Sequence, residues 1–347
     1  MVSPRAAQPA RLLRSCPSLF HQFLPLTNPP SQSRCFFCTP RQCQVPSTSM
    51  SSTAAPLSTT TSPQPLARGT QLTSPSGRCY TIDETIYQRS RGRLLCCLYR
   101  ASHEKKQYLL KDMLPGDYEY ILDLQRLVDG SAHVRTLVDT IPDCHMFVYP
   151  FLDTNLHQVQ TTAIAPALKK IILRDALAGL ADLHDKGIYH TDIKPANIMM
   201  DSFSKSDGAI GFTNVQITDL EDAVHTPADI FSFGITAIYV WMDRMVFFLD
   251  EANAAEDPSD MILKLHVSHF VNDLDDFGGF AEYHGGEQDP FVQRVIGLLG
   301  TLKKRAPFSR WHPVDPQFQD LVSKMTCLDP LRLITAREAL QHPWFSE

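Results

Sequence analysis

The sequence predicts an α+β protein, in which a small β-rich half precedes a larger helical half and a disordered segment precedes both. Three observations predict this class. The chain is rich in Ser, Thr, Pro and Gln up to residue 77, has short apolar strand-like runs from residue 79 to about 153, and then shows apolar residues at helical spacing. Two halves that differ in this way indicate a bilobal fold with a cleft between the lobes.

Residues 1–77 are predicted to be disordered, because a chain of this composition buries too little apolar surface to offset its ordering entropy. The first 82 residues contain seven Arg and no Asp, Glu or Lys, whereas the whole chain has a net charge of −6. A basic, acid-free N-terminus is typical of a mitochondrial presequence, but several early prolines oppose an amphipathic helix. We therefore expect an intracellular protein of the cytoplasm or nucleus, with the mitochondrion as the alternative.

The composition excludes several classes of protein. The chain after residue 82 is acidic, so a broad nucleic-acid-binding surface is not expected. The nine Cys include one isolated C-x-x-C pair, Cys35 and Cys38, without a second ligand pair at the spacing of a zinc site, so we expect free thiols. The most apolar run, residues 230–242, is too short to cross a bilayer and predicts a buried helix rather than a membrane span.

Local patterns predict the elements of each half. In the β-rich half, residues 93–100 and 107–113 read as a hairpin, residues 117–128 as a helix, and residues 146–152 as another strand. In the second half, an amphipathic stripe ends near His184 and Gly187, and two short apolar strands follow. The remainder is predicted to be mainly helical, and the last helix covers residues 335–345.

Three polar residues within six positions supply the parts that phosphoryl transfer requires. Asp192 can accept a hydrogen bond from an acceptor hydroxyl, Lys194 can neutralise charge on the transferred phosphoryl group, and the amide oxygen of Asn197 is a hard ligand suited to Mg²⁺. Asp219 follows a short apolar run, where a second magnesium ligand is needed. Lys111 ends an apolar strand, from which it could reach the inner phosphates.

These motifs resemble those of the eukaryotic-type protein kinase family, of the Ser/Thr-kinase-like kind. Residues 190–197, His-Thr-Asp-Ile-Lys-Pro-Ala-Asn, are similar to the kinase catalytic loop H-R-D-x-K-x-x-N. The other matching segments are residues 108–111 (the ATP-lysine strand), 219–221 (the D-F-G place), 229–234 (the buried helix of the large lobe), and 329–332 with 339–345 (the closing helix). The resemblance covers a domain of residues 78–347, with an N-lobe of about 79–153 and a C-lobe of about 154–345.

The resemblance implies Mg-ATP-dependent phosphoryl transfer to Ser/Thr hydroxyls of a protein substrate that the sequence does not identify. It implies that Asp192 is the catalytic base and that Lys194 assists at the transferred phosphate. It implies that Asn197 and Asp219 hold Mg²⁺. The residues implied to bind ATP are Lys111, Gly92 of the glycine-rich loop, Asn197, Asp219, and the hinge backbone of Pro150, Phe151 and Leu152 beside adenine.

The sequence departs from the family pattern at several positions. Only Gly92 remains of the glycine-rich loop, and Tyr87 and Arg89 stand where the family has glycine. Apolar spacing on the first helix places Tyr120 where a Glu should pair with Lys111, so either the helix turns to use Glu119 or the ion pair is missing. Other departures are Thr191 in place of the Arg that reads activation-loop phosphorylation, and Glu221 in place of the D-F-G glycine.

The largest departure is a short step between two motifs. Asp219 and Asp229 are ten positions apart, whereas the family places the activation loop and the peptide-binding platform there. Arg332 matches an Arg whose Glu partner belongs to that segment. We interpret the step, at Val224 and His225, as a segment lost through a skipped exon or a gene-model error, with a true short-loop variant as the alternative. Two further hypotheses remain: a pseudokinase that acts as a binding scaffold, and a kinase of a non-protein substrate.

Overall fold

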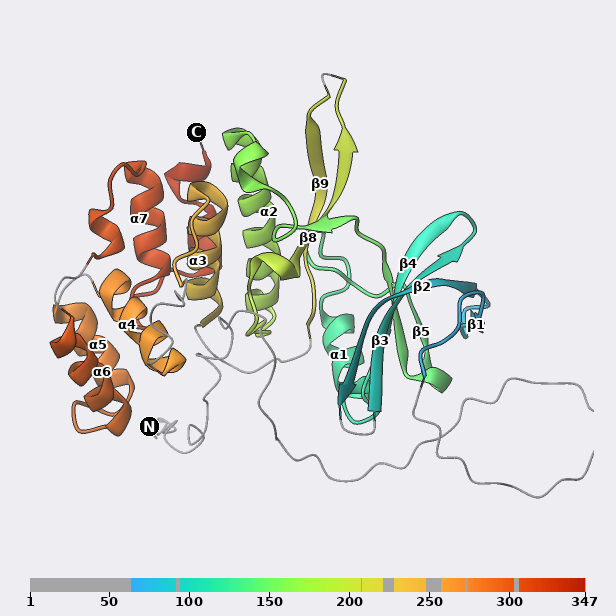
Figure 1. Ribbon diagram of the computed structural model, residues 1–347, viewed down its shortest axis with the longest axis horizontal. Helices are drawn as coiled ribbons and strands as arrows, with labels where there is room; N and C mark the ends of the chain where they lie inside the picture. Colours follow the sequence, from blue (N-terminus) through green and yellow to red (C-terminus); the bar gives the residue numbers. More distant parts are fainter. Residues whose placement is uncertain are drawn as a thin grey trace, which may run out of the picture. The chain divides into compact units, whose positions relative to one another are not determined.

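The computed structural model describes residues 64–91, 94–206, 208–220, 228–247, 257–271, 274–302 and 306–346 (Figure 1). These residues belong to two compact units, which divide in the segment between residues 220 and 228. Every predicted site residue that the structure describes lies in the first unit. The predicted lobe boundary near residue 153 falls inside this unit and stays a prediction.

The first unit is built on a six-stranded antiparallel sheet, with the strand order β1-β2-β3-β4-β6-β5. Its strands are β1 (Gln71–Thr73), β2 (Cys79–Arg91), β3 (Leu94–His103), β4 (Lys106–Asp112), β5 (Asp139–Ile141) and β6 (Met146–Pro150). The predicted hairpin is confirmed as β3 and β4, in which Leu98 is opposite Lys111.

The ordered part of the chain begins earlier than the predicted limit at residue 77. Strand β1 pairs with β2, and Leu66 and Leu72 pack against a core that includes Tyr80, Ile82 and Tyr99. These two leucines were missed in the sequence because the residues around them are mostly polar. They pack on the core of the sheet and bury apolar surface there. Residues 1–63 of the predicted disordered segment, with Cys35 and Cys38, lie outside the described residues.

Helix α1 (Tyr118–Leu127) confirms the predicted helix and most of its apolar face, since Ile121, Leu124 and Val128 of the predicted stripe are buried. The predicted apolar stripe included Leu127, which is 54 % exposed. Tyr118 and Gln125 are also buried on this helix, and the Tyr118 ring lies 4.8 Å from the ring of Phe147 on β6. The aromatic side chain adds a large apolar surface to the buried face.

A smaller sheet and a long helix complete the first unit. Strands β7 (Thr154–Asn155), β8 (Ile198–Ser204) and β9 (Ile210–Ile217) pair in that order, and the predicted strands at 198–200 and 215–217 belong to β8 and β9. Helix α2 (Pro166–Asp185) packs against β9. A Cβ atom on Gly179 of α2 would lie 2.2 Å from the carbonyl oxygen of His133, so only glycine allows residues 133–135 to approach the helix this closely.

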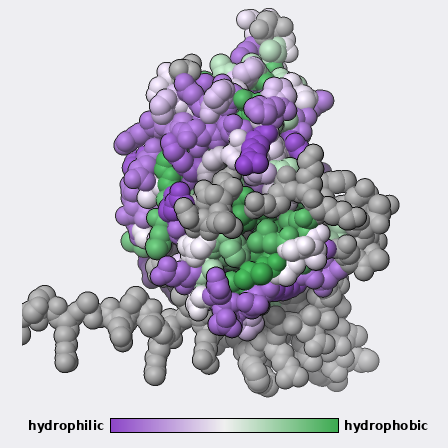
Figure 2. All heavy atoms as spheres, turned by 90° about the vertical axis from the view of Figure 1, so that its left-hand side faces the viewer, coloured by the Kyte–Doolittle hydropathy of each residue, from purple (hydrophilic) through white to green (hydrophobic). Residues whose placement is uncertain are grey.

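The second unit is helical, as predicted, and contains α3 (Ala228–Met242), α4 (Pro258–Phe270), α5 (Leu274–Tyr283), α6 (Pro290–Thr301), α7 (Pro316–Met325) and α8 (Ala336–Leu340). Asp257, Asp289 and Asp315 cap α4, α6 and α7, each before a Pro in the first turn. One core of this unit joins α4 and α6 through Leu263, Val267 and Val295. Figure 2 shows hydrophobic residues (green) in a central area and along the left edge of a face whose other coloured residues are largely hydrophilic.

Helix α3 confirms the buried helix predicted for residues 230–242, since its described side chains are buried around most of its circumference. Within the described parts of the chain, each helix is either too short or too polar to cross a membrane.

Candidate functional site

A buried histidine holds the loop that carries the predicted catalytic residues. His190 is 1 % exposed, and its Nδ1 accepts a hydrogen bond from the backbone N–H of Asp192 at 3.3 Å. Nε2 therefore carries the proton and donates to the carbonyl oxygen of Thr218 at 2.8 Å. The imidazole thus fixes the backbone before Asp192 against the backbone before Asp219.

Lys194 and Asn197 both donate hydrogen bonds to one carboxylate oxygen of Asp192. Lys194 Nζ donates to Asp192 Oδ2 at 2.6 Å, and Asn197 Nδ2 donates to the same atom at 3.0 Å and to the Asp192 carbonyl oxygen at 2.9 Å. Both partners of Nδ2 are acceptors, which supports this orientation of the amide. Oδ1 of Asp192 and Oδ1 of Asn197 form no hydrogen bond with other residues of the described ranges, so both oxygens are available to a ligand.

Lys111 and Asp219, which are far apart in sequence, meet at this loop. Lys111 Nζ at the end of β4 donates to Asp219 Oδ1, just after β9. The Thr218 N–H donates to the Asn197 carbonyl oxygen at 2.9 Å, so the backbones beside Asp219 and Asn197 are in contact. The structure therefore brings together Lys111, Asp192, Lys194, Asn197 and Asp219, the five polar site residues predicted from the sequence.

The electrostatics of Asp219 reflect this position. Burial alone would raise the pKa of its carboxyl group, but Lys111, through its charge and its hydrogen bond, lowers it below the ordinary value, with smaller contributions from His190 and Lys194. Asp219 also has a φ of 74°, in the left-handed region that residues other than glycine rarely adopt, and Thr191 has a φ of 63°. Such backbone strain is typical of functional sites.

The donor set fits Mg²⁺ that is shared with phosphate oxygens. Magnesium in phosphoryl-transfer sites is held by one or two protein oxygens, with water and substrate phosphates completing the octahedron. The Asn197 amide and the Asp219 carboxylate are oxygen ligands of this kind. In the described ranges, no three His, Cys, Asp or Glu side chains cluster as they would around a metal that the protein alone encloses.

The structure decides between the two sequence hypotheses for the partner of Lys111. Glu119 is exposed on α1 and forms no ion pair with any residue of the described ranges, and Tyr120 is 51 % exposed. The residue of this turn that faces the sheet is Tyr118. The hypothesis that the helix turns to use Glu119 is therefore wrong in this conformation, and the lysine pairs with Asp219 instead.

Of two other predicted ATP contacts, the structure describes the hinge but not the glycine-rich loop. Gly92 lies outside the described residues, as does Glu221, so the glycine-rich loop stays a prediction. The hinge is described: Pro150 ends β6, the Phe151 N–H donates to the Gln107 carbonyl oxygen at 3.3 Å, and Leu152 is buried.

Arg135 is a residue that the sequence interpretation missed. It is 6 % exposed, and Nε donates to the Pro150 carbonyl oxygen at 3.1 Å, while Nη2 donates to the same oxygen. Burial lowers the pKa of the guanidinium to about 10, so it stays charged at neutral pH. The available signal was a single charged residue within an otherwise apolar and small-residue stretch before β5.

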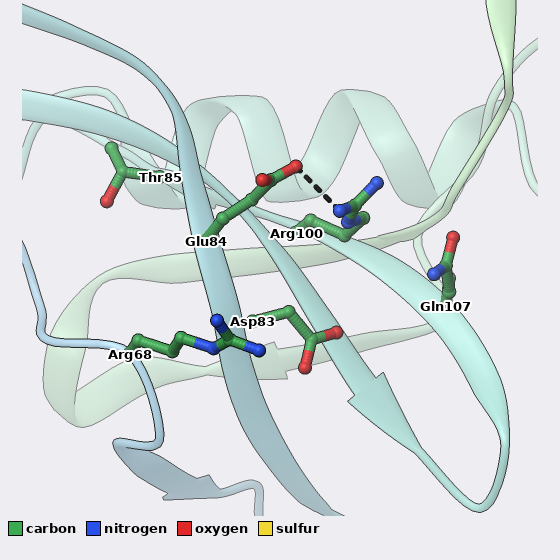
Figure 3. A pocket seen from close by; sticks show the side chains of 6 residues that line it. All are labelled: Arg68, Asp83, Glu84, Thr85, Arg100 and Gln107. Atoms are coloured by element: carbon green, nitrogen blue, oxygen red, sulfur yellow. Dashed lines mark ion pairs between the residues drawn. The ribbon is translucent and has the colours of Figure 1, made fainter.

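A separate polar cavity of about 570 Å³ lies on the six-stranded sheet, lined by Arg68, Asp83, Glu84, Thr85, Arg100 and Gln107 (Figure 3). Arg100 forms an ion pair with Glu84 at 2.9 Å. The cavity contains none of the predicted site residues, and its two basic and two acidic side chains balance in charge. It therefore has no evident preference for an anionic ligand.

Comparisons with known proteins agree with the predicted family. No protein-family model matches the chain. Over 177 residues, half of this chain, it is 27% identical to the human serine/threonine-protein kinase DCLK3, of which the match covers 24%. Over 279 residues it is 21% identical to cyclin-dependent kinase B2-1 of Oryza sativa, and the match covers 69% of this chain and 81% of that protein.

The solved structure of the MAP kinase LmaMPK10 from Leishmania major resembles the chain with a TM-score of 0.55 at 19% identity, over 77% of this chain and 83% of that one. This likeness shows the predicted bilobal α+β kinase fold. Together with the Ser/Thr protein kinases among its relatives, it supports the predicted resemblance to the eukaryotic-type protein kinase family. The chain spans only about a quarter of the length of DCLK3.

Proposed function

We propose that this protein catalyses Mg-ATP-dependent phosphoryl transfer to Ser or Thr hydroxyls. The observation that carries the proposal is the convergence of Lys194 and Asn197 on Oδ2 of Asp192. This arrangement holds the carboxylate rigidly and leaves Oδ1 to accept the hydrogen bond of an attacking hydroxyl.

The other residues have complementary roles in this proposal. Mg²⁺, held by Asn197 and Asp219, would neutralise the phosphates and orient them. Lys194 lies beside Asp192, where its charge stabilises the phosphoryl group during transfer. Lys111 would contact an inner phosphate, and Asp219, which it now pairs with, would hold Mg²⁺.

Substitution of Asp192 tests the assignment. The Asp192→Asn variant should lose phosphate transfer from Mg-ATP to a mixed peptide substrate by about 10²–10⁴-fold, the usual contribution of a positioned base. Asp129→Asn is the matched control and should keep the wild-type rate, because the exposed Asp129 carboxylate forms no hydrogen bond or ion pair within the described ranges. Equal rates for Asp192→Asn and the wild type would refute the assignment.

We expect the wild-type rate itself to be low. Asp219 and Asp229 are only ten positions apart, which is too short a step for the peptide-binding platform of the family, and residues 221–227 lie outside the described residues. Sequencing the transcript across Val224 and His225 tests whether a segment is absent from this chain. A longer transcript with an added acidic residue there would supply a partner of the kind the family pairs with Arg332.

A second candidate function is a nucleotide-binding scaffold without catalysis. The pairing of Lys111 with the metal ligand Asp219, rather than with a helix glutamate, favours it. Mg-ATP at 100 times its Kd should raise the free energy of unfolding by about 2.7 kcal/mol. A stability gain that is equal in the wild type and Asp192→Asn, without phosphate transfer by either, would support the scaffold over the kinase.

A further inference from the structure

Arg135 is a buried cation whose direct contacts are uncharged, although Asp219 and Asp201 act on it electrostatically. In the part of the chain that the structure describes, no carboxylate forms an ion pair with it. Its contacts are the Pro150 carbonyl oxygen, the Met199 Sδ at 3.7 Å from Nη1, and the Tyr149 ring, whose centroid lies 5.4 Å from Cζ. Desolvating a charged group is costly, so these specific contacts must hold the guanidinium in place.

The side chain joins the two sheets of the first unit at the hinge. Pro150 and Tyr149 belong to β6 of the large sheet, and Met199 belongs to β8, two positions after Asn197. The end of β9 fixes the Arg135 backbone. The Arg135 N–H donates to the Ile217 carbonyl oxygen at 2.8 Å, and the Ile217 N–H donates to the His133 carbonyl oxygen at 2.8 Å. The guanidinium therefore lies between the hinge and the strand that follows the metal-ligand loop.

Arg135 saturates the Pro150 carbonyl oxygen. A carbonyl oxygen has two lone pairs, and the Nε and Nη2 N–H groups of Arg135 both donate to it. The exocyclic amino group of adenine is a neutral donor, whereas hydrogen bonds from a guanidinium are charge-assisted and about twice as strong. A base that uses this carbonyl must displace the stronger donor and leave a buried cation with fewer partners.

We propose that Arg135 occupies the base position of the nucleotide site, so that the resting chain binds a nucleoside triphosphate through its phosphates alone. This inference rests on the proposed function, because it assumes that Pro150 to Leu152 lie beside the base and that Lys111 and Asp219 receive the phosphates. It makes Arg135 the residue that sets nucleotide affinity at this site.

Two probes separate the base from the phosphates: Mg-ATP, and magnesium tripolyphosphate, which lacks base and ribose. Calorimetric titration of the full chain should give Kd values for the two probes that agree within about threefold, a difference under 1 kcal/mol. In Arg135→Val, Mg-ATP should bind about tenfold more tightly, while the affinity for tripolyphosphate should stay the same.

A second substitution of Arg135 and a control substitution at Arg78 complete the test. Arg135→Met keeps an unbranched side chain of similar length without donors, and it should also gain affinity for Mg-ATP; it serves where Arg135→Val does not fold. Arg78→Val is the matched control, because Arg78 also donates to a backbone carbonyl, that of Val138 at 3.2 Å, but from an exposed position away from the hinge. It should change neither Kd.

The outcomes distinguish this inference from the proposed function. If the wild type already binds Mg-ATP about tenfold more tightly than tripolyphosphate, or if neither Arg135 variant changes that ratio, the inference is wrong and the phosphate site stands. If neither probe binds any of the variants, the proposed function fails as well.

Discussion

Lys111 at the end of β4 and Asp219 after β9 form an ion pair across 108 positions of the sequence. The pair joins the six-stranded sheet to the smaller sheet at the loop that carries Asp192. It also engages the carboxylate to which we assign magnesium. In the proposed function, Mg²⁺ at Asp219 would compete with Lys111 for this carboxylate, and the pair has a measurable consequence even without a ligand.

Asp219→Asn should reduce the loss of stability at low pH. The folded-state pKa of Asp219 is lowered by Lys111, so its stabilising effect is present above the ordinary Asp pKa of about 3.9 and is lost as the pH falls through the lower folded-state value. Urea unfolding between neutral pH and pH 3 should show a shallower decline for Asp219→Asn than for the wild type. Parallel declines would show that the pair contributes no pH-dependent stability.

Gly179→Ala should destabilise the first unit by about 1–3 kcal/mol, the usual cost of overpacking. The added methyl group would lie 2.2 Å from the His133 carbonyl oxygen, so the segment that carries Arg135 must move away from α2. Denaturant unfolding measures the effect. Gly297→Ala on α6 is the control: no atom lies within 4 Å of its Cβ position, so that change should be neutral or stabilise by about 0.5–1 kcal/mol.

The sequence predicted those elements whose structure depends on residues close together in the chain. The spacing of apolar residues predicted α1, α2 and α3, and alternating apolar runs predicted β3, β4 and β6. The loop from His190 to Asn197 was predictable because the hydrogen bonds around Asp192 join residues at most five positions apart, whereas the bonds of His190 and Asn197 to Thr218 are long-range.

Features that depend on distant contacts could not be predicted in the same way. The apolar stripe predicted on α1 is buried at Ile121, Leu124 and Val128, but the burial of Tyr118 depends on its contact with Phe147 on β6. The partner of Lys111 depends on how β4 and β9 meet. Arg135 is a single charged residue in an otherwise apolar and small-residue stretch of the sequence, but its contacts with Pro150 and Met199 depend on how β6 and β8 meet.

Gln125→Leu should stabilise the chain by about 1–3 kcal/mol, the desolvation cost of an unsatisfied buried polar group. Gln125 is 3 % exposed on α1, and its Oε1 has no hydrogen-bond donor among the described residues. Leucine has a similar size and a good helix propensity. The neighbouring exposed Arg126→Leu is the control in denaturant unfolding, and its effect should stay within about 0.5 kcal/mol. A loss of stability in Gln125→Leu would indicate that Oε1 is satisfied in solution.

Asp112→Asn should stabilise the protein at neutral pH and have little effect near pH 4. Burial raises the pKa of Asp112 to about 6, although the Cys97 N–H donates to its Oδ2 at 2.9 Å. Since the folded state holds this proton more tightly than the unfolded state, stability falls as the pH rises from about 4 to about 6. The asparagine keeps an acceptor for Cys97 and has no charge to desolvate, so the gain at pH 7 should reach up to about 3 kcal/mol.

Asp139, on β5 of the same sheet, provides a control of opposite sign. Burial would raise the pKa of its carboxyl group, but hydrogen bonds from Ser76, Ser74, the Thr140 N–H and Tyr80 lower it below the ordinary value. Asp139→Asn should therefore destabilise the protein at neutral pH and lose this effect as the pH falls below about 4. If the stabilities of Asp112→Asn and Asp139→Asn depend on pH in opposite directions, burial raises the pKa of Asp112 and hydrogen bonds lower that of Asp139. The same pH dependence for both variants would contradict both assignments.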